Sequence, residues 1–99
     1  MFAVLGSFRF PPESLERAMP QMQALIAATL TERGCRTYAY SEDVADPGLF
    51  RVIELWDTRE QLAAHFETPH MQVWIEQREA LGFYDREVEV HEIGATESL

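Results

Sequence analysis

The chain has 99 residues, 46% of them hydrophobic and 11% aromatic, which suits one small globular domain and excludes a disordered chain. The formal net charge of −9 disfavours binding to nucleic acid or to an anionic membrane, because both attract basic patches. A single cysteine fits a reducing compartment, and no apolar run approaches the roughly 20 residues of a membrane span. We therefore expect one cytoplasmic domain over residues 1–99, with residues 94–99 as a loose tail.

The first predicted elements are a strand from Phe2 to Phe10 and a long helix. Pro11-Pro12 ends the strand and opens the helix, because proline is tolerated in a first helical turn. From Ser14 to about Arg33, apolar residues recur at helical spacing: Leu15, Ala18, Met22, Leu25, Ile26, Thr29 and Leu30. Pro20 should kink or divide this helix, and Gly34 should stop it.

Two strands should follow, from Cys35 to Val44 and from Leu49 to Asp57, joined by the turn-forming residues 45–48. The second strand is apolar on both faces. Phe50, Val52 and Trp56 lie on one face of this strand, and Ile53 and Leu55 lie on the opposite face. A strand of this kind needs cover on both sides. Helices can cover one side, and in so short a chain a second subunit is the simplest cover for the other. The sequence therefore predicts a homodimer.

The second half of the chain contains two helix starts and a last strand. Thr58 to Gln61 is a capping-box pattern, and Thr68-Pro69 places a capping residue before a proline in the first helical position. The second of these helices should end near Gly82, and the last strand should run from Tyr84 to Ile93. The order βαββαβ predicts an α+β fold, a ferredoxin-like antiparallel sheet with helices on one face.

His65 is the first candidate for chemistry. It shares a helical face with Leu62 and Phe66, so its imidazole should lie between helix and sheet. An ordinary pKa of about 6.5 suits proton transfer near neutral pH. The alternative is a structural histidine that is hydrogen-bonded to a strand carbonyl.

His70 is the second candidate, in the first turn of the next helix and one turn before Trp74. Its imidazole could reach the same cavity as His65, or it could serve only as a cap or packing contact. Two histidines five residues apart are a poor metal pair, no third ligand is evident, and zinc-binding spacings are absent. The sequence therefore predicts no metal site and no cofactor.

Phe66, Met71 and Trp74 could wall a pocket for a flat ligand, or they could be plain core. Arg78, one turn after Trp74, could orient a phenolate or a carboxylate in that pocket. A surface salt bridge to Glu76 or Glu79 is the alternative for Arg78.

Glu54 is unusual because it lies between apolar positions of a strand, where a carboxylate needs partners. We expect a tyrosine hydroxyl or an arginine to fill that need. The role expected for Glu54 is structural and interfacial.

Three signatures carry a resemblance to a known family. They are Gly34-Cys35-x-x-Tyr38-x-Tyr40, Glu54-x-Trp56 and Leu62-x-x-His65-x-x-x-Pro69-His70. Together they resemble the antibiotic biosynthesis monooxygenases, and the last one is similar to the quinol-oxidising branch. The resemblance implies a dimeric α+β barrel, in which two sheets close face to face. It also implies oxidation of electron-rich phenols by O₂ without flavin or metal.

The leading functional hypothesis is thus a cofactor-independent monooxygenase that acts on a small quinol or phenol, with His65 as proton acceptor. His70 and Trp74 would shape the pocket. Two other hypotheses remain open. One is an isomerase or dehydratase of a small carbonyl compound that uses His65 and His70 as an acid–base pair. The other is a ligand-binding or stress-response dimer without turnover.

Overall fold

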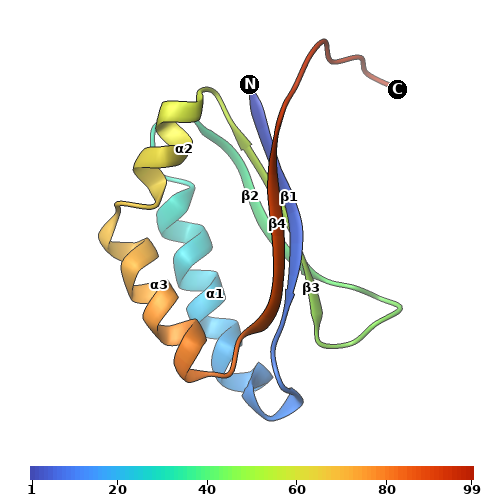
Figure 1. Ribbon diagram of the computed structural model, residues 1–99, viewed down its shortest axis with the longest axis vertical. Coiled ribbons are helices and arrows are strands. Elements are labelled where there is room, and N and C mark those ends of the chain that lie inside the picture. Colours follow the sequence, from blue (N-terminus) through green and yellow to red (C-terminus); the bar gives the residue numbers. More distant parts are fainter.

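Four antiparallel strands form one sheet in the order β2–β3–β1–β4, and the helices lie together on one of its faces (Figure 1). This computed structural model describes residues 1–99. The elements in chain order are β1 (Phe2–Arg9), the 3-10 turn η1 (Pro12–Ser14), α1 (Leu15–Thr29), β2 (Cys35–Glu42), β3 (Leu49–Trp56), α2 (Arg59–His65), α3 (Pro69–Ala80) and β4 (Tyr84–Glu92). The ferredoxin-like α+β fold predicted from the sequence is confirmed. None of the helices combines the length and apolar character that a membrane crossing requires.

The two faces of the sheet differ in cover. On the helix side, β3 buries Phe50, Val52, Glu54 and Trp56. On the other side, Ile53 is 44% exposed and lies opposite Leu5 of β1, which is 48% exposed. The prediction that the third strand is apolar on both faces is confirmed, and Figure 1 shows that its second face is open within this chain.

Helix α1 corrects two expectations. It ends at Thr29, and Leu30 is half-exposed, so Leu30 does not belong to the core stripe. Pro20 does not divide the helix, because the residues on both sides of it stay helical. Proline near a helix start leaves only the carbonyl four residues earlier, that of Glu16, without its usual N–H partner.

The starts of α2 and α3 are fixed by two caps that the sequence predicted. The side chain of Thr58 accepts a hydrogen bond from the backbone N–H of Gln61. The side chain of Gln61 accepts one from the backbone N–H of Thr58. Thr68 accepts from the backbone N–H of Met71 and donates to the carbonyl of His65 at 2.7 Å. The hydroxyl of Thr68 therefore bonds to the end of α2 as well as to the start of α3.

Two glycines are needed where the chain packs closely. Gly6 of β1 lies between β3 and β4, and a Cβ there would collide with the backbone of Glu87 and Val88. Gly34 has φ +84°, a conformation that favours glycine, and the amide of Gln61 lies where its Cβ would be. Gly34 thus lets the turn after α1 pack against α2.

Candidate functional site

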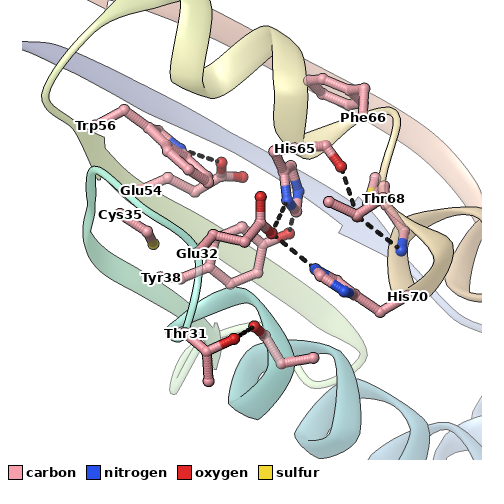
Figure 2. A network of polar contacts seen from close by, with 12 residues as sticks. Thr31, Glu32, Cys35, Tyr38, Glu54, Trp56, His65, Phe66, Thr68 and His70 are labelled. Atoms are coloured by element: carbon pink, nitrogen blue, oxygen red, sulfur yellow. Dashed lines mark hydrogen bonds and ion pairs between the residues drawn. The ribbon is translucent and has the colours of Figure 1, made fainter.

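A network of polar side chains joins three segments of the chain (Figure 2). Oε2 of Glu32, in the turn after α1, lies 2.7 Å from Nδ1 of His65 and 2.7 Å from Nε2 of His70. A carboxylate can only accept, so each imidazole donates an N–H to it. Glu32 therefore connects the end of α2 and the start of α3 to the turn between α1 and β2.

His65 is the buried centre of this network, with 1% of its surface exposed. Burial lowers the pKa of its imidazole below the ordinary value, although the hydrogen bond that it donates to Glu32 opposes this effect. The ring is therefore neutral at pH 7. With a proton on Nδ1, its Nε2 presents a lone pair, 3.4 Å from the hydroxyl of Tyr38. The structural alternative named a strand carbonyl as partner, and the partners are instead Glu32 and Tyr38.

Two tyrosines of β2 extend the network along the sheet. The hydroxyls of Tyr38 and Tyr40 are 2.9 Å apart, as expected for residues that share one face of a strand. Burial raises the pKa of Tyr40 to about 12 and raises the pKa of Tyr38 well above its ordinary range. Both hydroxyls therefore stay protonated near neutral pH, so they act as hydrogen-bond donors and not as bases.

Glu54 corrects an expectation about its partner. Its Oε1 accepts a hydrogen bond of 3.0 Å from Nε1 of Trp56, two residues along the same face of β3. We expected a tyrosine or an arginine in that place. Burial raises the pKa of Glu54 to about 7. A carboxyl group that titrates near neutral pH beside a cavity can transfer protons, so Glu54 is a candidate to which the sequence argument gave only a structural and interfacial role.

A small cavity lies between the sheet and the pair α2 and α3. Its volume is about 30 Å³, which is room for about one water molecule. Its lining comes from the strands and from the two short helices: Val4, Phe8, Tyr38, Tyr40, Val52, Glu54, His65, Phe66, Met71, Arg78, Phe83, Arg86 and Val88. Of the six predicted site residues, His65, Phe66, Met71 and Arg78 line this cavity.

His70 and Trp74 lie elsewhere. They line a groove of about 360 Å³ that also has Pro20 and Gln21 of α1 in its walls. His70 is therefore connected to His65 through their shared partner Glu32, and it does not line the cavity that His65 lines. The expectation of one shared cavity for both histidines is wrong, because the two rings approach Glu32 from different sides (Figure 2).

Arg78 faces inward and has no carboxylate partner, so the expected surface salt bridge to Glu76 or Glu79 is absent. Its guanidinium lies 4.5 Å from the centre of the Phe83 ring. Burial, and then the charge of Arg86, lower the pKa of Arg78. Arg86 lines the same cavity from β4, and the sequence argument missed it. Two guanidinium groups beside one cavity favour an anion there.

Glu32 is the other important residue that the sequence argument missed. It supplies the third ligand whose apparent absence argued against a metal, because its oxygen and one nitrogen of each histidine all lie within 4.8 Å of one another. The available signal was indirect. Two histidines directed inward from the same helix junction require an acceptor, and the turn before Gly34 contains a carboxylate.

Comparison with known proteins gives a consistent result. The sequence profile of the family Antibiotic biosynthesis monooxygenase matches residues 1–77. The uncharacterized protein sll1783 of Synechocystis is 28% identical over 96 residues, which is 97% of this chain but only 65% of that protein. YgiN of Escherichia coli K12, named a probable quinol monooxygenase, is 30% identical over 86 residues, covering 77% of this chain and 83% of YgiN.

Solved structures agree over nearly the whole chain. A Deinococcus radiodurans protein described as a putative antibiotic biosynthesis monooxygenase matches with a TM-score of 0.94 and 25% identity, over 100% of this chain and 98% of the other. Rv0793 of Mycobacterium tuberculosis matches with a TM-score of 0.86 and 26% identity, over 98% of both chains. The family profile spans more than half of the sequence and the fold agrees, so this chain belongs to the antibiotic biosynthesis monooxygenase family.

Proposed function

We propose that the protein oxidises a small quinol or phenol with O₂ and without a cofactor, with His65 as the proton acceptor. The observation that carries this proposal is the orientation of His65. Its Nδ1 donates to Glu32 at 2.7 Å, which leaves Nε2 unprotonated beside the cavity, where the hydroxyl of Tyr38 lies 3.4 Å away. Membership of the family and similarity to YgiN support the choice of reaction.

In this mechanism a substrate hydroxyl gives its proton to Nε2 of His65. The carboxylate of Glu32 stabilises the imidazolium that forms, and Arg78 and Arg86 stabilise the phenolate. The electron-rich anion then passes an electron to O₂, and the two radicals combine into a hydroperoxide. Loss of water leaves one oxygen atom in the product, so a phenol and O₂ give a quinone and water. The substrate supplies every electron, and no external reductant is needed.

A substrate ring needs more room than the cavity of about 30 Å³ provides. A second hollow of about 170 Å³ lies beside it, and both are lined by Phe66, Arg86, Val88 and Val4. The side chain of Phe66 is the obvious moving part, because the residue is 39% exposed while its ring packs beside His65. In our proposal, rotation of Phe66 and Arg86 joins the two spaces and admits the substrate.

Oxygen uptake tests the proposal. Metal-stripped protein is mixed with hydroquinones, anthrones and flavonols, and uptake above autoxidation is recorded for the native protein and for His65→Gln. We expect the substitution to lower turnover by about 10²- to 10⁴-fold, which is the usual contribution of a general base. His91→Gln is the matched control, because His91 is half-exposed on β4 and away from the cavity. Uptake that is unchanged in His65→Gln would contradict the assigned role.

A second candidate function is favoured by Glu54. With a pKa of about 7, its carboxyl group can pair with His65 in the same cavity to move a proton between two carbon atoms of a carbonyl compound. That isomerase chemistry needs no oxygen. Turnover of a small hydroxy ketone under strict anaerobic conditions would support it, and turnover that requires O₂ would support the first proposal.

We also propose that two copies of the chain pair through the open face of the sheet. Leu5 lies opposite Ile53 and Ala3 lies opposite Leu55, so apolar side chains are adjacent on this face. Ile53→Glu should shift the protein from dimer to monomer with little change in the secondary structure of each protomer, because a charge there would be buried in the pair. Sedimentation equilibrium measures this. A native protein that sediments as a monomer of 11.4 kDa would disprove the pairing.

A further inference from the structure

We propose that Glu32, His65 and His70 form a binding site for one divalent transition-metal ion of the zinc and cobalt type. Nδ1 of His65 and Nε2 of His70 each lie 2.7 Å from Oε2 of Glu32, and the three residues offer one ligand atom each within 4.8 Å of one another. Two imidazoles and one carboxylate are the protein ligands of many catalytic zinc sites and of non-haem iron sites. The site goes beyond the proposed oxidation, which uses the metal-free protein.

The present geometry is close to what an ion requires. Metal–ligand distances of roughly 2.0–2.2 Å place the ligand atoms of a tetrahedral site about 3.3–3.6 Å apart. Oε2 of Glu32 is now 2.7 Å from each nitrogen, so it must move away from each of them by about 0.6–0.9 Å. Rotation about the side-chain bonds of Glu32 can provide that shift.

The two imidazoles are already held in place. Thr68 donates to the carbonyl of His65 at 2.7 Å and caps α3 just before His70. The ring of His65 is wedged against Tyr38 and Trp56, with centroid separations of 5.3 and 5.2 Å. Binding therefore needs little ordering of the two histidines, and rigid ligands favour affinity.

Tyr38 provides the outer partner that a metal-bound histidine requires. When Nδ1 of His65 binds the ion, the ring proton moves to Nε2, which faces the hydroxyl of Tyr38 at 3.4 Å. Metal-binding histidines usually direct the second N–H at a polar group of this kind. One carboxylate also offsets part of the ionic charge, and the net charge of −9 attracts cations to the protein as a whole.

His70 provides access from solvent. Its side chain is 26% exposed and lines the groove between α1 and α3, which has a volume of about 360 Å³. An ion can therefore enter from this side and keep a water molecule as a further ligand. The groove is also lined by Gln21, whose Oε1 is buried without a hydrogen-bond partner and is an unused acceptor.

The test uses the metal ion alone. Protein stripped with a chelator is titrated with Co²⁺, and binding is followed by visible d–d absorption and by calorimetry. We expect one Co²⁺ per chain, displaced by Zn²⁺. Glu32→Gln and His70→Ala should each weaken binding by at least about tenfold, because even the loss of an outer-shell partner has an effect of that size. Since no substrate is present, the result does not depend on the proposed oxidation.

His91→Gln is the matched control. His91 also lies near a carboxylate, that of Glu89 at 3.5 Å, but on the exposed edge strand β4. Binding should be unchanged in this variant. The proposal is overturned if native protein binds no Co²⁺, if Glu32→Gln binds as tightly as native protein, or if binding is lost in His91→Gln. Circular dichroism checks that each variant is folded, and the partly exposed His70 makes His70→Ala decisive if Glu32→Gln unfolds.

Discussion

The layer between the sheet and the helices has two ends of different construction. One end is a cluster of aromatic rings at centroid separations of 5.0–6.3 Å: Phe8, Phe10, Phe50, Trp74 and Phe83. At the other end Trp56 packs with ionisable groups, namely Glu54, His65 and, through His65, Glu32. Rings pack in many arrangements, whereas each buried ionisable group needs a specific partner. The aromatic end therefore stabilises the fold, whereas the polar end lowers stability in part because it holds buried ionisable groups in fixed positions.

The largest effect that we expect from breaking this division is at the aromatic end. Phe10 is 1% exposed and contacts four other rings, so Phe10→Ala should lower the free energy of unfolding by about 3–5 kcal/mol. Turnover per folded molecule should change much less. Urea unfolding measures the loss. Val44→Ala is the control, because Val44 lies in an exposed loop and should change stability by no more than about 0.5 kcal/mol. Equal losses in the two variants would refute the division.

At the polar end, Glu54 should make stability depend on pH. Its pKa is about 7 in the folded protein against an ordinary 4.5, so the folded state keeps a proton that the unfolded chain has released. Stability that is fully present below pH 4.5 is therefore lost as the pH rises through about 7. The rise in the pKa of Glu54 from 4.5 to about 7 corresponds to about 3 kcal/mol.

Glu54→Gln should abolish that contribution, because the amide oxygen can still accept from Trp56 and does not ionise. The measurement compares unfolding free energies of native protein and variant at several pH values between 4 and 8. The difference between them should change in favour of the variant as the pH rises. A difference that stays constant across this range would show that Glu54 is not a buried titrating group.

The smallest expected effect concerns the tyrosine pair, which lies between the two ends. Tyr40→Phe removes the hydroxyl contact of 2.9 Å to Tyr38 but keeps the ring near Phe8 and Trp74. We expect the free energy of unfolding to fall by about 0.5–1.5 kcal/mol, the usual net contribution of one hydrogen bond. Thermal unfolding provides the measurement. A loss as large as that of Phe10→Ala would contradict this value, because the substitution keeps the ring and removes only the hydroxyl.

Most of the fold could be predicted from the sequence, because its signals are local. The alternation of residues between two strand faces located the strands, and the capping patterns at Thr58 and Thr68 located the starts of α2 and α3. The predicted end of α1 was less accurate, since Leu30 continues the apolar spacing although the helix stops at Thr29. Only tertiary packing decides whether one more apolar residue is covered.

The site was harder to predict for the same reason. His65 stood out because helical spacing directs it inward, and it is buried. Glu32 lies in a polar turn between Thr31 and Arg33, where a carboxylate normally faces water, and its partners are 33 and 38 residues away. Nothing local distinguishes it from the other acidic residues. Arg86 was missed likewise, because only the register of β4 against β1 shows which of its side chains face inward.

The strand order has a consequence for synthesis of the protein. β1 precedes the other three strands in the sequence, yet it lies between β3 and β4, so both of its edges stay unpaired until the strands that begin at Leu49 and Tyr84 are made. Until Tyr84–Glu92 has emerged from the ribosome, one edge of β1 and the apolar side chains beside it have no partner. Unpaired edges promote aggregation of nascent chains, and pairing between distant segments slows folding. The strand order therefore leaves the sheet incomplete, with one open edge on β1, until β4 is made.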